Sequence, residues 1–204
     1  INDAGRNFRL ISVPVHNPDP AAGEEIIPHR DEVMLEDVEL FADHYAVVER
    51  EQGIPGIRIV EFENGRIHTV DFPEPVYEAY PSINVQWETR RLRYGYQSLI
   101  TPSSVFEFDL DTDTSTLLKQ TEVLGGYDQT LYASERRFAT AQDGTQVPVS
   151  IIYRKETPRN GTTPLLMIGY GSYGWAYPVT FNSTRLSLID RGVTFAVAHI
   201  RGGG

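Results

Sequence analysis

Short β-type runs without helical periodicity fill residues 7–120, and this pattern constrains the fold more than any other feature of the sequence. The runs are rich in β-branched and aromatic residues, and turn signals such as Glu63-Asn64-Gly65 separate them. They comprise residues 8–15, 33–41, 45–49, 57–62 and 66–72. Runs of this kind predict strands, so we expect this part of the chain to be all-β.

A weak internal repeat indicates how these strands are arranged. YAVVEREQGIPGIRIVEFENG begins at Tyr45, and LRYGYQSLITPSSVFEFDLDTD begins about 47 residues later at Leu92. In both stretches a strand precedes a turn with proline, a second strand with alternating acidic and aromatic residues, and an acidic tight turn. A four-stranded propeller blade takes about 40 to 50 residues, so the spacing favours consecutive blades. On pattern alone, a β-sandwich remains the alternative.

The pattern changes at the Leu-Gly-Gly of residues 124–126. Beyond it, residues 134–141 and 146–153 flank an Asp-Gly pair, which is a strong hairpin signal. A polar loop with proline and glycine follows. We therefore place a domain junction at residues 125–133.

The last part of the chain alternates strand and helix. We expect strands at residues 165–168 and 194–200, joined by a glycine loop and a helix. The helix prediction depends on Asn182 or Ser183 as the N-cap and on Gly192 just beyond its end. This alternation predicts the start of an α/β sheet.

The glycine loop contains Gly169, Gly171 and Gly174, which have the GxGxxG spacing of a dinucleotide-binding turn. In that fold, however, a helix opens directly at the glycines, and an acidic residue after the second strand holds the ribose. Here the helix begins only near Asn182, and Arg201 follows the second strand. Because arginine accommodates the phosphate of NADP in such folds, an NADP-dependent oxidoreductase is disfavoured and not excluded.

Ser172 lies within the same loop but not in a nucleophile elbow, because Tyr170 occupies a position that G-x-S-x-G reserves for glycine. In α/β-hydrolases the loop between a strand and the first helix supplies a donor to the oxyanion hole. The alternative is that the aromatic residues Tyr170, Tyr173, Trp175 and Tyr177 pack over the edge of the sheet.

Composition limits the partners. The formal net charge of −10 disfavours sequence-independent binding of nucleic acid, which requires clustered Lys and Arg. The sequence has no cysteine for a disulfide, a thiolate nucleophile or a Cys-based zinc site. Its apolar runs are much shorter than the roughly 20 residues of a membrane-spanning helix, and we see no signal peptide. We expect a cytoplasmic protein that binds neither nucleic acid nor membrane.

We expect structural roles for the histidines, because none belongs to a nucleophile and base arrangement. The five are His16, His29, His44, His68 and His199. The carboxylates Asp109, Asp111 and Asp113 have the spacing of a calcium loop, but the glycine and distal glutamate of an EF-hand are missing. We therefore expect a solvated turn there, and neither a metal nor a cofactor.

Several stretches closely resemble the prolyl oligopeptidase family of serine peptidases. They are GYGSYG, RLSLIDRG and AHIRGGG in residues 169–204, preceded by LLKQTEVLGGYD and SERRFATAQDGTQVPVSIIY. The resemblance extends upstream through IPHRDEVMLEDVELFADHYAVVER and LRYGYQSLITPSSVFEFDLDTDT, so it covers nearly the whole chain. It is closest to the oligopeptidase B branch, which cleaves after Lys or Arg.

The resemblance implies a β-propeller followed by the start of an α/β-hydrolase domain. Residues 1–124 would be the last propeller blades, residues 125–133 the junction, and residues 134–204 the first strands and first helix of an incomplete catalytic domain. The chain begins at Ile1 and stops in Arg-Gly-Gly-Gly, so we expect an internal fragment of something longer.

The resemblance also implies site residues. Tyr170, in the family's G-Y-G motif, would donate a hydrogen bond to the oxyanion of the tetrahedral intermediate. Tyr173 matches an aromatic position near the substrate pocket in the prolyl-specific branch. The catalytic Ser, Asp and His of the family, and the acidic residues that bind a basic substrate, would lie beyond Gly204.

We therefore predict part of a serine oligopeptidase that hydrolyses short peptides after Lys or Arg by acyl transfer. The propeller would limit substrate size, and the fragment alone would be inactive. Its partners would be short basic peptides and the rest of the same polypeptide. The alternative from a different class is a non-catalytic propeller module that binds peptides or proteins.

Overall fold

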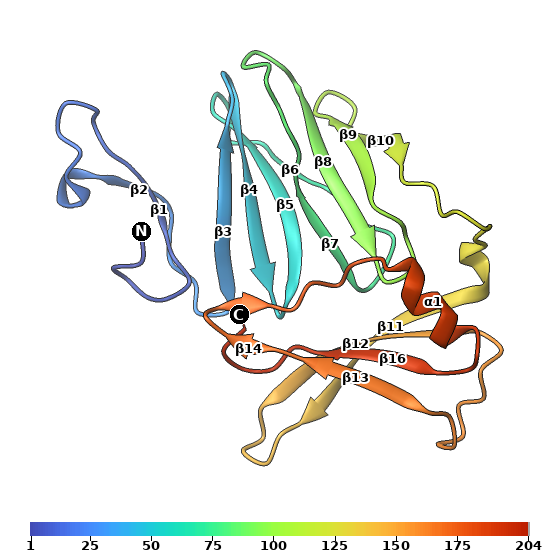
Figure 1. The fold of residues 1–204 in the computed structure, drawn as a ribbon. Coiled ribbons are helices and arrows are strands. Elements are labelled where there is room, and N and C mark those ends of the chain that lie inside the picture. Colours follow the sequence, from blue (N-terminus) through green and yellow to red (C-terminus); the bar gives the residue numbers. More distant parts are fainter. Residues whose placement is uncertain (204) are drawn as a thin grey trace.

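The computed structural model describes residues 1–203, in which strands form three four-stranded sheets and two smaller pairs (Figure 1). The first sheet has the order β3-β4-β5-β6, the second the order β7-β8-β9-β10, and the third the order β11-β12-β16-β13. In Figure 1 the first two sheets stand side by side, and the third lies across their lower ends.

Each of the first two sheets is an antiparallel meander of consecutive strands. The first sheet comprises β3 (Val33–Leu40), β4 (His44–Glu51), β5 (Ile54–Glu61) and β6 (Ile67–Thr69). The second comprises β7 (Tyr77–Pro81), β8 (Arg91–Ser98), β9 (Ser104–Asp109) and β10 (Thr114–Gln120). The sequence repeat corresponds to β4 and β5 in one sheet and to β8 and β9 in the next, so two equivalent units follow each other as predicted.

A hydrophobic core lies between the first and second sheets. Along β5, buried and half-buried residues alternate, as expected when one face of a strand is turned into a core. The fully buried members include Phe41, Ala46, Ile57, Ile59, Leu92, Tyr94, Phe108 and Leu110. The two sheets therefore pack face to face over alternate side chains from both.

A two-stranded ribbon covers the other face of the first sheet. It consists of β1 (Leu10–Ser12) and β2 (Glu24–Ile27). Ile27 packs with Tyr45 and Val47, whose side chains point away from the core between the sheets. The predicted strand at residues 8–15 was wrong in its extent, because only β1 pairs and Phe8 has a φ of 63°. The pattern also missed β2 and β7.

The third sheet mixes antiparallel and parallel pairing. Its strands are β11 (Tyr132–Thr140), β12 (Gln146–Arg154), β13 (Leu165–Gly169) and β16 (Thr194–Ala198). The first two form the predicted Asp-Gly hairpin, whereas β13 and β16 run parallel to each other. The predicted strand at residues 194–200 is shorter than expected, because pairing ends at Ala198.

Helix α1 (Ser183–Ile189) connects the two parallel strands. Asn182 is its N-cap, and the Asn182 side chain accepts hydrogen bonds from the backbone N–H groups of Thr184 at 2.9 Å and Arg185 at 3.3 Å. This satisfies donors that the first turn of a helix leaves free. The strand, helix and strand order predicted from the sequence is confirmed. No helix in residues 1–203 has the length and apolar character needed to cross a membrane.

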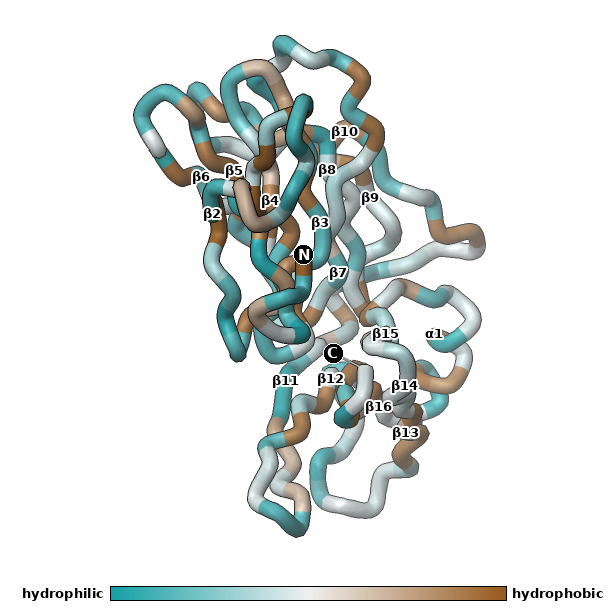
Figure 2. The backbone as a smooth tube through the Cα atoms, turned by 90° about the vertical axis from the view of Figure 1, so that its left-hand side faces the viewer, coloured by the Kyte–Doolittle hydropathy of each residue, from teal (hydrophilic) through white to brown (hydrophobic). Residues whose placement is uncertain are grey.

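A second core joins the third sheet to the lower end of the second sheet. Its buried members are Val76, Leu99, Tyr132, Ile152, Val179, Leu186, Ile189, Phe195 and Val197. Figure 2 shows the hydrophobic residues, in brown, in the region of β13 and β16. Because Val76 and Leu99 flank strands of the second sheet while Phe195 and Val197 belong to β16, the two parts of the chain share one core.

Candidate functional site

The glycine loop after β13 folds into a tight hairpin. Strands β14 (Gly171–Ser172) and β15 (Trp175–Ala176) pair, with Ser172 opposite Trp175. The turn residues Tyr173 and Gly174 have φ values of 61° and 67°, and two-residue hairpin turns with positive φ at both central positions match the twist of the strands. The sequence pattern predicted only a loop here, because Tyr173 is an unusual residue at such a position.

Glycines in this hairpin allow a second segment of backbone to approach it. A Cβ on Gly171 would overlap the carbonyl oxygen of Arg201 and lie 2.8 Å from Ile200 Cγ1. The N–H of Gly174 donates to the carbonyl oxygen of Gly202 at 3.0 Å. The two glycine-rich stretches, residues 169–174 and 201–203, therefore form one packed unit. The hairpin of β14 and β15 also separates these glycines from the start of α1, which argues against the dinucleotide interpretation.

Tyr170 lies at the carboxyl end of β13 and is supported by a row of aromatic rings. Its side chain is 38% exposed. The Tyr170 and Trp175 rings meet edge to face at 5.4 Å and 75°, and the rings of Trp175 and Tyr177 do so at 5.9 Å and 68°. Such contacts are favourable geometries for aromatic pairs. Tyr173, at the tip of the hairpin, is 98% exposed, so the two tyrosines have different surroundings.

The structure contains a serine and histidine pair that the sequence pattern did not indicate. The Oγ of Ser150 lies 2.8 Å from Nε2 of His199. Ser150 is completely buried, and Nδ1 of His199 is buried without a hydrogen-bond partner among the described residues. Burial, together with the charges of Arg136 and Arg50, lowers the pKa of His199 to about 4. Ser150 is buried, His199 is half-buried, and no carboxylate among residues 1–203 orients the imidazole, which fits the structural role expected for His199.

His68 and the acidic turn belong to a polar network between the first and second sheets. Nε2 of His68 lies 2.9 Å from Glu61, and Nδ1 of His68 contacts Asp113. Arg90 binds Glu61 at 2.9 Å and Asp111 at 2.7 Å. The expectation of a solvated turn was therefore incomplete. The carboxylates of this turn are partly exposed, but they pair with His68 and Arg90. Within residues 1–203, no group of three or more potential ligands is arranged for a metal ion.

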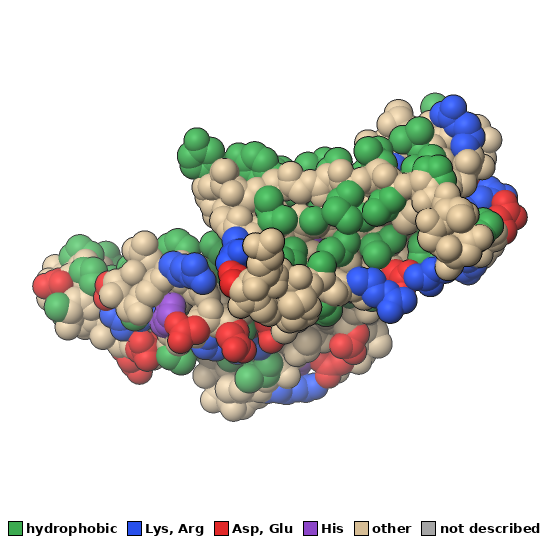
Figure 3. Space-filling model, turned by 90° about the horizontal axis from the view of Figure 1, so that it is seen from below, with side chains coloured by type: hydrophobic (Ala, Val, Ile, Leu, Met, Phe, Trp, Pro, Cys, Tyr) green, Lys and Arg blue, Asp and Glu red, His purple; other side chains and the backbone are tan. Residues whose placement is uncertain are grey.

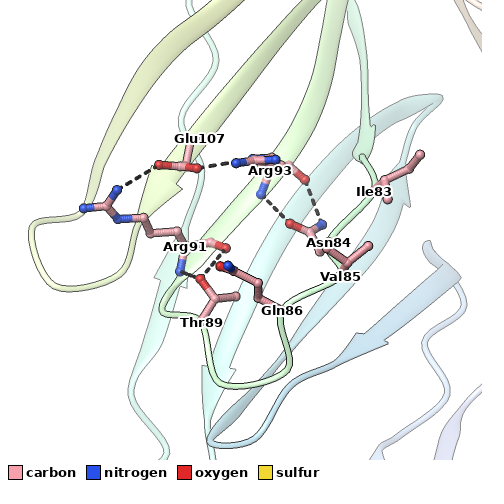
Figure 4. A pocket seen from close by; sticks show the side chains of 8 residues that line it. All are labelled: Ile83, Asn84, Val85, Gln86, Thr89, Arg91, Arg93 and Glu107. Carbon is pink, nitrogen blue, oxygen red and sulfur yellow. Dashed lines mark hydrogen bonds and ion pairs between the residues drawn. The ribbon is translucent and has the colours of Figure 1, made fainter.

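A shallow hollow of about 210 Å³ lies on the second sheet (Figure 4). Its lining residues are Ile83, Asn84, Val85, Gln86, Thr89, Arg91, Arg93 and Glu107. Arg91 and Arg93 both bind Glu107, at 3.2 Å and 3.3 Å. The Asn84 side chain forms hydrogen bonds with both the N–H and the carbonyl oxygen of Arg93. Arg91 also lies 3.6 Å from Asp109, so each arginine of the hollow already has a carboxylate partner.

Consecutive four-stranded meanders that share a core define a β-propeller segment. The family described as "Prolyl oligopeptidase, N-terminal beta-propeller domain" matches residues 1–121. The chain belongs to the prolyl oligopeptidase family, and its first and second sheets are propeller blades. The resemblance stated from the sequence is confirmed, and the β-sandwich alternative is wrong.

Curated relatives and solved structures agree with this assignment. The chain is 38% identical, over 98% of its length, to dipeptidyl aminopeptidase BI of Pseudoxanthomonas mexicana, and 30% identical, over 99% of its length, to protease 2 of Moraxella lacunata. It superposes on oligopeptidase B from Leishmania major with a TM-score of 0.87, at 31% identity and over 97% of the chain. It spans 28%, 29% and 29% of these three proteins, respectively.

Proposed function

We propose that this chain is part of a serine oligopeptidase and that Tyr170 supplies a hydrogen bond to its oxyanion hole. In this proposal residues 1–124 are propeller blades, residues 125–133 are the junction, and residues 134–204 begin an α/β-hydrolase domain. The observation that carries it is the place of Tyr170, directly after a parallel strand. In open α/β sheets, ligands bind at the carboxyl ends of such strands.

The proposed chemistry is acyl transfer. A serine from a part of the protein outside this chain attacks the peptide carbonyl, and the carbonyl oxygen takes up negative charge as a tetrahedral intermediate forms. The Tyr170 phenol donates a hydrogen bond to that oxygen, a contribution of about 3 kcal/mol for one such donor. Collapse of the intermediate breaks the C–N bond, and the amine leaves with the proton that the serine hydroxyl gave to a histidine outside this chain during its attack. Water then hydrolyses the acyl-enzyme.

The proposed substrates are short peptides cleaved after Lys or Arg, with the propeller limiting their size and with Tyr173 near the bound peptide. The likeness to oligopeptidase B and the net charge of −10, which favours cationic ligands, support this choice. The relative named dipeptidyl aminopeptidase favours a second candidate, release of dipeptides from free amino ends. A non-catalytic peptide-binding module is the alternative outside enzymes.

A substrate panel on the full-length protein separates these candidates. Amide substrates with Lys, Arg or Pro before the scissile bond are compared, each with a blocked and a free amino end. We expect blocked basic substrates to give the highest kcat/KM. A requirement for a free amino end would favour the release of dipeptides. Preference for Pro would contradict the basic specificity, and no turnover at all would favour the binding module.

Tyr170→Phe in the full-length enzyme tests the oxyanion role. Because only the phenolic hydroxyl is lost, we expect turnover of the preferred amide to fall by about tenfold or more with folding intact. Tyr80→Phe, which removes a hydroxyl from a partly exposed tyrosine of β7, is the matched control and should retain turnover. Unchanged turnover in Tyr170→Phe would remove this residue from the mechanism.

A further inference from the structure

Glu78, a residue of the second sheet, makes a polar contact with the segment that leaves the Tyr170 hairpin. Its Oε1 accepts a hydrogen bond from the backbone N–H of Val179 at 3.0 Å. Its Oε2 accepts a hydrogen bond from Nη2 of Arg50, in the first sheet, at 3.2 Å. The Glu78 side chain is only 12% exposed. One carboxylate thus links both propeller sheets to the chain that follows β15.

Arg50 is itself fixed, so it holds the Glu78 carboxylate in place. Nε of Arg50 binds Glu36 at 2.6 Å, and its Nη1 donates to the carbonyl oxygen of Gly53 at 3.0 Å. Burial acts to lower the pKa of Arg50, but Glu36 and Glu78 outweigh that effect and raise it, so the guanidinium stays charged. Hydrogen bonds between ionised groups are stronger than those between neutral groups.

The contact point on the other side is equally well fixed. Val179 has no exposed side-chain surface and belongs to the core that the third sheet shares with the second. Tyr177 packs against the same core, and its ring contacts Trp175, which in turn contacts Tyr170. A continuous path of contacts therefore runs from the Glu78 carboxylate to the Tyr170 ring.

We propose that Glu78 is a positioning residue for the oxyanion donor, and this inference depends on the proposed role of Tyr170. By accepting the Val179 N–H, Glu78 fixes the exit of the hairpin, and the rings of Tyr177 and Trp175 transmit that position to the phenol. A hydrogen bond aimed at a developing charge depends steeply on placement, because even about 1 Å of displacement costs large factors in rate. The propeller thereby contributes to turnover as well as to substrate selection.

Two substitutions in the full-length enzyme distinguish the hydrogen bond with Val179 from the ion pair with Arg50. Glu78→Gln keeps a carbonyl oxygen that reaches the Val179 N–H but loses the ion pair with Arg50. Glu78→Asp keeps the charge but is one methylene too short for Val179. We expect Glu78→Asp to lower kcat on the preferred amide by about tenfold, with KM within about threefold of the original. Glu78→Gln should lower kcat less, by about threefold, because its amide oxygen still accepts from Val179 although Arg50 no longer holds it.

The opposite order would overturn the proposal, because a role through charge or general stability would make Glu78→Gln the more damaging change. So would unchanged kcat in Glu78→Asp. Glu107→Asp is the matched control, since Glu107 binds Arg91 and Arg93 on a surface away from the hairpin, and it should leave kcat unchanged.

The same substitutions in the Tyr170→Phe background show whether Glu78 acts through the phenol. We expect Glu78→Asp to lower kcat by less than about twofold there, because the donor that it positions is already absent. Full additivity would overturn the positioning role while leaving the oxyanion role intact. If Tyr170→Phe by itself retained full turnover, the proposed function would fail first, and the role of Glu78 with it.

Discussion

His68 shows how much one buried residue can depend on its partners. Both ring nitrogens contact carboxylates, and a carboxylate only accepts hydrogen bonds. Hydrogen bonds from His68, then Arg90 and Asn64, lower the pKa of Glu61 to about 2, and His68 is also the main cause of the lowered pKa of Asp113.

We predict that His68→Gln lowers the Tm of the full-length protein near pH 6, by at least about 2 °C. A glutamine amide cannot reach both carboxylates as the two ring nitrogens of His68 do. The difference should shrink as the pH falls from about 4.5 towards 2, because a carboxylate with a lowered folded-state pKa adds stability only while it is ionised.

Thermal unfolding across this pH range, with the exposed His16→Gln as control, provides the measurement. A Tm difference that stayed constant down to pH 2 would contradict the coupling between His68 and Glu61. An unchanged Tm at pH 6 would show that the neighbouring arginines satisfy these carboxylates without His68.

At the scale of elements, the hairpin of β14 and β15 depends on a glycine with no room for a side chain. We predict that Gly171→Ala displaces residues 200–203, because the added Cβ would overlap the Arg201 carbonyl oxygen. Overpacking of this kind costs about 1 to 3 kcal/mol. In the full-length enzyme, turnover should fall by at least about tenfold, because Tyr170 directly precedes the overpacked residue.

Gly56→Ala in β5 is the matched control for this prediction. A Cβ on Gly56 would meet its nearest neighbour, the Glu49 carbonyl oxygen, at an ordinary 3.8 Å. We expect that substitution to be neutral or slightly stabilising, because alanine restricts the unfolded chain. Equal Tm and turnover in the two variants would show that the hairpin tolerates a shift of its neighbour.

At the scale of the whole molecule, the third sheet has an uncovered hydrophobic surface. Figure 3, which views the molecule from below, shows hydrophobic side chains gathered over this sheet. Two large members, Leu165 and Met167, share one face of β13 and are 55% and 50% exposed. Contiguous apolar surface of this kind is rare on free-standing proteins and marks a region that packs against other structure.

We predict that residues 1–204 expressed alone bind a hydrophobic dye or aggregate, whereas the full-length protein does not. Dye fluorescence and light scattering at matched concentrations give the comparison. Replacing Leu165 and Met167 with polar residues should reduce dye binding by the fragment if this sheet is the source. A sharp, reversible thermal transition of a monomeric, dye-free fragment would contradict the prediction.

Much of the fold was determined by the sequence because local rules decide it. Alternating apolar residues and turn signals placed β3, β4 and β5, and the repeat identified two equivalent sheets. An Asp-Gly pair located the hairpin of β11 and β12, and Asn182 marked the start of α1. These features depend on neighbours within a few residues, so the sequence displays them directly. The strand β7 was missed because its short, mixed run lacks clear alternation.

Only the tertiary structure decided which distant groups meet. The contact of Glu78 with Val179 joins residues far apart in the chain, and so do the contact of His68 with Asp113 and the packing of Gly171 against Arg201. Nothing in the spacing of these residues encodes the contacts, because each depends on how whole sheets pack. The sequence thus determined the elements and the family resemblance, while packing between sheets determined the surroundings of Tyr170.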